Sequence, residues 1–152
     1  MKKFRFTLQP VLEHRQRIED DFKVALGTRR RELAVAQAEL DRLTERYREH
    51  SEMLRGEHRS LSAEDLRLHY AHIAFLDRAI DAQRAVVAAR AATVDRARAE
   101  VLEASKERKA VEKLKERRGE AHAEEERRVE QNELDDSNAR RHARTAERTP
   151  SP

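Results

Sequence analysis

The chain has 152 residues, of which 41% are charged and 4% aromatic, and its formal net charge is +3. It has no cysteine, which excludes disulfides, thiol catalysis and a cysteine-based zinc site. No apolar run approaches the roughly 20 residues of a membrane span, and no apolar signal core follows the first residues. Dense charge with few glycines and prolines is typical of long helices, so we expect a cytoplasmic helical protein without a globular core.

The N-terminal segment is expected to be a short arm followed by a long helix. Residues 1–7 alternate between apolar and basic side chains and form the predicted arm. Thr7 is a candidate N-cap, and Pro10 suits a first helical turn because its missing N–H would have no intrahelical acceptor. The first helix is predicted over residues 8–55, with a ladder of apolar residues that steps by seven: Leu26, Leu33, Leu40, Tyr47 and Leu54.

A short connection and a second, longer helix follow. The connection is predicted at residues 56–61, because Gly56 can cap the first helix. Ser62 can start the second helix by accepting a hydrogen bond from the N–H of Asp65. This helix is predicted over residues 62–146, and its ladder also steps by seven: Leu66, Ile73, Ile80, Val87 and Val94. Residues 147–152 are expected to be a disordered tail.

The two ladders match each other when the chain folds back at the connection. The numbers of the facing residues then sum to 120, from Leu54 with Leu66 to Leu26 with Val94. Short connections favour antiparallel neighbours, and a strict repeat of seven favours a left-handed supercoil. The predicted fold class is therefore all-α, a long two-helix antiparallel left-handed coiled coil whose ladders form its seam. The second helix overhangs the first in this helical hairpin, and residues 119–146 should be unpaired.

No residue pattern indicates catalysis, and we expect no enzyme, no cofactor and no small-molecule substrate. His69 and His72 lie three positions apart on one helix, but the sequence offers no third metal ligand at a suitable spacing, so no metal site is expected. The phase of the ladder places Phe75 and at least one of Tyr70 and His72 on the outward face. Exposed aromatic side chains favour a surface that binds a partner.

Three segments of the sequence carry a resemblance to a known family. They are Phe4-x-Phe6-x-Leu8-x-x-Val11-Leu12-x-x-Arg15-x-x-x-Glu19, then Tyr70-x-x-Ile73-x-x-Leu76-x-x-Ala79-Ile80, and finally Lys113-Leu114-x-x-Arg117-Arg118 with Glu130 and Leu134-Asp135-Asp136. Together they resemble the flagellar FliJ family. A Leu-Asp-Glu commonly closes the family pattern, and this chain has Asp136 at the third position.

The resemblance implies a stalk of the flagellar type III protein export apparatus, similar in shape to the central stalk of rotary ATPases. FliJ-family stalks sit in the pore of the hexameric export ATPase and reach towards the membrane export gate protein. They promote assembly of the ATPase ring, help couple hydrolysis to export, and handle export chaperones. The implied location is the cytoplasm, peripherally associated with the inner membrane at the flagellar base.

The resemblance also implies two binding surfaces. The export-gate surface would consist of Leu43, His50, His72, Leu76, Ala79 and Gln83. The family often has Phe where His72 stands and His where Gln83 stands. The ATPase-facing end would be formed by the paired termini, with Arg15, Arg117 and Arg118 contacting acidic pore loops.

Three alternatives fit the same pattern. The equivalent stalk of a virulence-type injectisome would have this architecture and different client proteins. A basic helical nucleic-acid-binding protein is compatible with the cluster Arg29-Arg30-Arg31, but aromatic residues that could stack on bases are scarce, which disfavours nucleic acid as a partner. A parallel homodimeric spacer would join the ladders of two chains.

Overall fold

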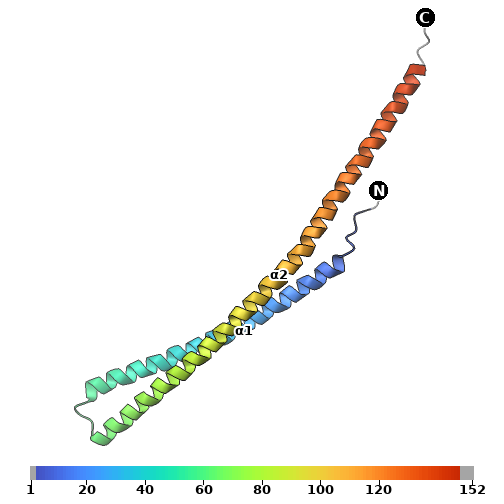
Figure 1. Cartoon of the computed structure of the whole chain (residues 1–152). Coiled ribbons are helices and arrows are strands. Elements are labelled where there is room, and N and C mark those ends of the chain that lie inside the picture. The colour runs from blue at the N-terminus through green and yellow to red at the C-terminus, as the bar shows by residue number, and fades with distance from the viewer. Residues whose placement is uncertain (1–2, 148–152) are drawn as a thin grey trace. The chain divides into compact units, whose positions relative to one another are not determined.

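The structure is a computed structural model that describes residues 3–147, and within that range two long helices and no strand are found. Helix α1 spans Gln9–Glu57 and helix α2 spans Ala63–Glu147 (Figure 1). Residues 17–105 form one compact unit, called here the loop unit, and the described residues at both ends of the chain form a second, the terminal unit. The predicted all-α helical hairpin is confirmed. The predicted tail lies outside the described residues, apart from Glu147 at the end of α2.

A capping box starts helix α2. The backbone N–H of Asp65 donates to the Ser62 hydroxyl oxygen at 3.1 Å, and the Asp65 carboxylate accepts from the Ser62 N–H at 3.2 Å. Glu64 and Asp65 also place negative charge at the positive end of the helix dipole. The bond expected between Ser62 and Asp65 is therefore present. Ser62 is the N-cap, so the helix begins one residue later than predicted, at Ala63.

Helix α1 ends at Glu57, beyond the predicted cap at Gly56. Gly56 stays helical and has no positive φ, so it does not end the helix in the way a left-handed glycine cap would. Instead Ser60 closes the last turn, because both its N–H and its hydroxyl donate to the Glu57 carbonyl oxygen, at 2.9 and 2.8 Å. The connecting loop consequently comprises residues 58–62 rather than 56–61.

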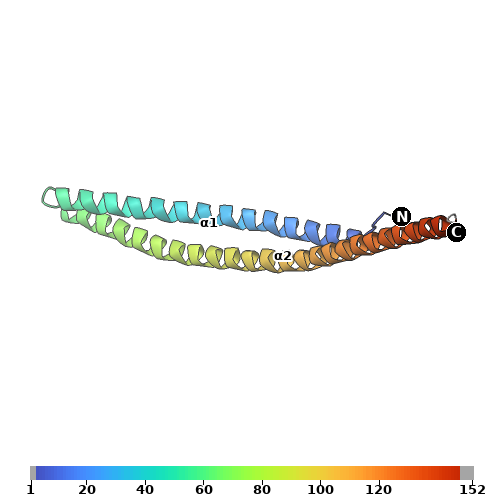
Figure 2. The same ribbon diagram turned by 90° about the horizontal axis from the view of Figure 1, so that it is seen from above.

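In the loop unit, α1 and α2 run antiparallel on either side of the loop and bury the predicted ladders between them (Figures 1 and 2). Leu54, Ile80 and Val94 are buried. The remaining ladder residues are half-buried: Leu26, Leu33, Leu40, Tyr47, Leu66, Ile73 and Val87. Cross-helix contacts follow the predicted register closely, since the residue numbers sum to 119 for Gln83 with Ala36 and for His69 with His50.

The seam of the loop unit contains a second row of residues that the sequence analysis did not assign on α2. This second row also steps by seven and consists of His69, Leu76, Gln83, Arg90, Ala97 and Ala104. Leu76 is only 1% exposed, the lowest value among the buried apolar residues. The polar members bond across to α1: Gln83 Nε2 donates to the Ala36 carbonyl oxygen at 2.8 Å, and Arg90 pairs with Glu32 at 3.1 Å. This row therefore combines apolar and polar layers.

In the terminal unit, the N-terminal arm lies along α2 and extends the pairing further than predicted (Figure 2). Lys115 Nζ donates to the Gln9 side-chain oxygen at 2.9 Å, and the rings of Phe4 and His122 lie 5.6 Å apart. Residues 119–122 are thus not unpaired, contrary to the prediction. The physical reason is that chain outside a helix can advance about 3.3 Å per residue against 1.5 Å within one, so a few arm residues cover a longer stretch of α2.

Thr7 does not cap α1 as expected. The N–H of Leu12 donates to the Leu8 carbonyl oxygen at 3.0 Å, which places Leu8 at the N-cap position of the helix that begins at Gln9. The Thr7 hydroxyl instead accepts a hydrogen bond from Arg118 of α2 at 3.4 Å. This bond helps to fix the arm to α2.

The helical glycines offer a first prediction. An added Cβ at Gly56 would meet nothing within 4 Å, and at Gly27 it would meet only the end of the Arg31 side chain at 3.7 Å. Because alanine loses less backbone entropy than glycine, we expect Gly27→Ala and Gly56→Ala each to raise the free energy of unfolding by about 0.5–1 kcal/mol. Urea unfolding followed by circular dichroism measures this. Unchanged or lower stability in both variants would contradict the continuous helix through these positions.

Candidate partner-binding surfaces

The six residues implied as an export-gate surface divide between two places in the loop unit. Leu76 and Gln83 belong to the second row of the seam, and Leu43 and His50 occupy seam positions on α1. Leu76 in particular is a core residue, so the closed hairpin does not present it to a partner. This corrects the expectation that Leu76 contributes to an exposed surface.

The other two, His72 and Ala79, are half-buried and belong to a mostly exposed row of α2 that we call the outer stripe. Its members alternate in steps of four and three, which places them on one face of the helix: Leu68, His72, Phe75, Ala79, Ala82 and Val86. Leu68 is 66% exposed and Phe75 58%. Tyr70, beside the stripe, is also exposed, so the prediction that Phe75 and a neighbouring aromatic face outward is confirmed.

The outer stripe exposes large apolar side chains to solvent, which is energetically unfavourable unless another surface covers them. Burial of a Leu or Phe side chain is favourable by roughly 1.5–3 kcal/mol, which an unpartnered surface does not gain. The alanines between the large residues would let another backbone approach closely. The stripe therefore has the chemistry of a surface for packing against a partner, with His72 as its one polar member.

The arginines implied at the ATPase-facing end all belong to the terminal unit. Arg15 pairs with Glu107 across the two helices and is half-buried. Arg118 lies 5.9 Å from the centre of the Phe6 ring and donates to Thr7. Arg117 is exposed on the same helix. Two of the three arginines thus hold the terminal unit together, and Arg117 points its charge at solvent.

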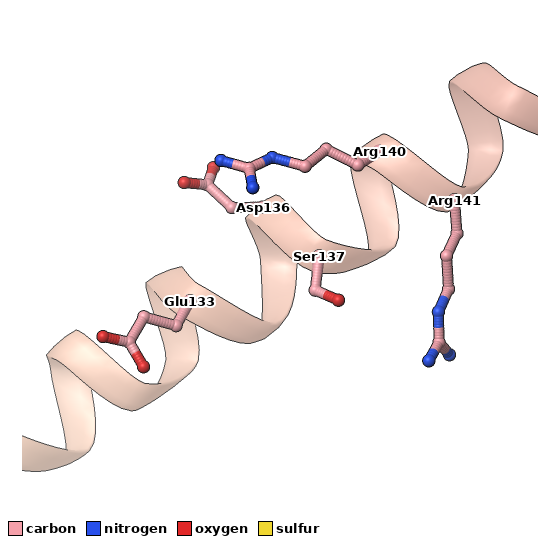
Figure 3. A pocket seen from close by; sticks show the side chains of 5 residues that line it. All are labelled: Glu133, Asp136, Ser137, Arg140 and Arg141. Atoms are coloured by element: carbon pink, nitrogen blue, oxygen red, sulfur yellow. The ribbon is translucent and has the colours of Figure 1, made fainter.

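The last described part of α2 is an open surface. Figure 3 shows Glu133, Asp136, Ser137, Arg140 and Arg141 projecting from this single helix. Every residue from 131 to 142 is exposed. The shallow hollow between these side chains is therefore lined by helix α2 alone.

Among residues 3–147, no group of three or more histidines or carboxylates is disposed to hold a metal ion. In the same part of the chain, neither helix has a stretch that is apolar enough over a sufficient length to cross a membrane.

The sequence matches the family described as Flagellar FliJ protein over residues 4–147, which is nearly the whole chain. The chain belongs to the FliJ family. The structure is also similar to that of a putative YscO homolog, CT670, from Chlamydia trachomatis, with a TM-score of 0.63 and 20% sequence identity. The match covers 96% of this chain and 99% of CT670, and at this identity it shows a shared fold. No curated protein sequence matches the chain.

Membership of the FliJ family identifies the chain as a stalk protein of type III protein export. Sequence reasoning predicted the arm of this FliJ-family protein but missed its contacts with α2, because contacts of a non-helical segment leave no periodic signal. The second row of the seam did leave a signal, since His69, Leu76 and Gln83 also recur every seven residues. That row is partly polar, and a search for apolar ladders does not find it.

Proposed function

We propose that this FliJ-family protein is the stalk of a flagellar export apparatus. It inserts into the ring of the hexameric export ATPase, promotes assembly and activity of that ring, and couples it to the membrane export gate and to export chaperones. The protein acts in the cytoplasm, at the inner membrane of the flagellar base. The observation that carries the proposal is the family match over residues 4–147 together with a two-helix hairpin.

The surface chemistry supports a stalk that turns or slips in a ring rather than one that is fixed there. Many ion pairs on the helix surfaces join residues three or four positions apart on one helix, such as Arg42 with Glu39 and Arg84 with Asp81. Exposed pairs of this kind contribute only about 0–1 kcal/mol each. A helical surface covered by them offers many shallow contacts that a cycling ATPase can make and break.

The outer stripe is the better candidate for the export-gate surface. His72 and Ala79 keep the role that the resemblance implied, and Leu68 and Phe75 join them as exposed apolar neighbours. Leu43, His50, Leu76 and Gln83 would act indirectly, by holding α2 in the register that presents the stripe. A gate protein would bind by packing apolar side chains against Phe75 and the alanines.

Arg117 is the candidate ATPase contact whose removal leaves the terminal unit intact, because it is exposed while Arg15 and Arg118 hold other residues. We expect Arg117→Glu to weaken binding to the export ATPase about three- to tenfold, the effect of reversing one exposed charge near acidic loops. Arg96→Glu, the same change at an exposed position of α2 in the loop unit, is the matched control. Titration of the ATPase with each variant at low salt gives the affinities, and equal affinities would exclude Arg117 from the contact.

The proposed function is tested by the turnover of the export ATPase encoded with this protein. Addition of the purified full chain should increase ATP hydrolysis per subunit and shift the ATPase from monomers to hexamers in size-exclusion chromatography. An ATPase whose turnover and assembly are indifferent to the chain would contradict the proposal. Stimulation of an injectisome ATPase but not of a flagellar one would assign the stalk to the injectisome instead.

A further inference from the structure

Three histidines meet across the seam at the loop end of the hairpin. His50 comes from α1, and His69 and His72 come from α2; all three are half-buried. His50 Nε2 lies 3.1 Å from His69 Nδ1. The ring centres of His50 and His72 are 4.7 Å apart, and those of His50 and His69 are 5.0 Å apart. The fold therefore brings a third imidazole to a pair that the sequence left without a partner.

This arrangement suits neutral imidazoles. In the contact between His50 and His69, one ring nitrogen must donate a proton and the other must accept it, which requires at least one neutral ring. When both rings are protonated, both nitrogens are donors and the bond is lost. The positive charges would also stand within contact of one another in a half-buried seam, where water screens them less than at the surface.

The surroundings of the cluster disfavour a proton on His50. Burial lowers the pKa of His50, and nearby His72 and His69 lower it further. On α2, Asp65 stands four positions before His69; hydrogen bonds from Ser62 lower the pKa of Asp65 most, and His69 lowers it further, so this carboxylate is shared between the helix cap and His69. The bond and ring contacts of the three histidines are with one another and with Phe75. The other charged residues within four positions of the cluster, or in the loop beside it, are Arg46, Arg48, Glu49, Glu52, Arg67, His58 and Arg59.

The cluster is also connected to the outer stripe. His72 is a member of both, and its ring is stacked with that of Phe75 at 6.3 Å between centres, with 20° between the ring planes. A movement of His72 away from His50 would therefore change the position of the most exposed aromatic residue of the stripe. The histidines link the closure of the seam to the shape of a candidate binding surface.

We propose that His50, His69 and His72 form a pH-sensitive clasp, which closes the loop end of the hairpin while His50 is neutral and opens it when His50 is protonated. The direction follows from linkage. A histidine whose pKa is lower in the closed state than in the open state takes up a proton on opening, so low pH favours opening. Above about pH 7.5 His50 is neutral in both the closed and the open state, because the ordinary histidine pKa is about 6.5, and the clasp stays closed. Closure is lost progressively as the pH falls through and below 6.5.

The test measures the distance between the two helices beside the clasp. The chain has no cysteine, so cysteines introduced at Met53 on α1 and Ala71 on α2, both exposed, can carry one spin label each. The full-length protein is studied with a chelator present, so that metal bound by imidazoles does not contribute. Lowering the pH from 7.5 to 5.5 should broaden and lengthen the distance distribution, and the opening constant should rise about tenfold per pH unit for each proton taken up.

Two variants and one control decide the outcome. His50→Leu replaces the central ring with an apolar side chain and should keep the distance short at pH 5.5. The triple variant His50→Gln, His69→Gln and His72→Gln should likewise lose the pH response, whatever its overall stability. His14→Gln changes an exposed histidine of the terminal unit and should respond as the unchanged chain does. A distance that is the same at both pH values in the unchanged chain, or an opening that persists in His50→Leu, would overturn the proposal. Since the isolated chain is used, this outcome does not depend on any export ATPase.

Discussion

Replacement of Leu76 with alanine is expected to lower the free energy of unfolding of this FliJ-family protein by about 2–4 kcal/mol. Leu76 is 1% exposed in the second row of the seam, and alanine would leave a cavity between two helices that have few other fully buried side chains. Leu68→Ala is the matched control, because it makes the same chemical change on the same helix at a position 66% exposed. The control should change stability by no more than about 0.5 kcal/mol.

Urea unfolding monitored by circular dichroism compares the two leucine variants directly. A lower free energy of unfolding for Leu76→Ala, with an almost unchanged value for Leu68→Ala, would confirm that Leu76 packs inside the hairpin. If the two variants were equally stable, Leu76 would not be in the core, and the register of the seam would be wrong. Binding assays with the export gate should give the reverse order under folded conditions, with Leu68→Ala as the weaker binder.

Removal of the Phe6 ring is expected to release the N-terminal arm from α2. Phe6 is 8% exposed and carries the guanidinium of Arg118 over its ring, so truncation to alanine removes both apolar contact and a cation–π interaction. Truncation of a buried Phe to Ala costs about 3–5 kcal/mol of stability in a closed core. Because the arm packs on one helix only, we expect its packing on α2 to lose stability near the lower end of that range. Local unfolding of this size would raise the exchange rates of the protected amides of α1 beside the arm by about a hundredfold.

Hydrogen exchange read out by mass spectrometry measures this release peptide by peptide. Phe4→Ala is the control, because Phe4 is 38% exposed and sits at the edge of the arm. We expect faster exchange in residues 9–16 for Phe6→Ala and a much smaller change for Phe4→Ala. No difference between the two variants would show that the arm is not held by Phe6.

The architecture could be predicted because it depends on a few strong periodic signals. Ladders that step by seven on both sides of one short break allow one antiparallel register, and the contacts of Gln83 with Ala36 and of His69 with His50 follow it to within one residue. A rotation of α2 about its axis by one residue, roughly 100°, would turn Ile80 and Val94 towards solvent. The apolar pattern therefore determines the pairing without any knowledge of the individual contacts.

The binding surfaces could not be predicted with the same accuracy, for a physical reason. Whether Leu76 or Leu68 faces the partner helix depends on the partly polar second row. There His69 and Gln83 are half-buried and are held by specific hydrogen bonds rather than by apolar packing. A sequence pattern does not reveal such bonds before the register is known. The docking of the arm on α2 was missed for a similar reason, because Phe4 and Phe6 contact α2 from outside any helix.

The central proposal is that this helical hairpin occupies the pore of one ATPase ring, and the stoichiometry of the complex tests it most directly. Native mass spectrometry of the full-length chain mixed with its export ATPase and a non-hydrolysable nucleotide can count both components. We predict a complex of about six ATPase subunits with a single copy of the chain, as a single pore requires. ATPase hexamers without bound chain, or one chain bound to every ATPase subunit, would contradict the proposal that the protein is a stalk.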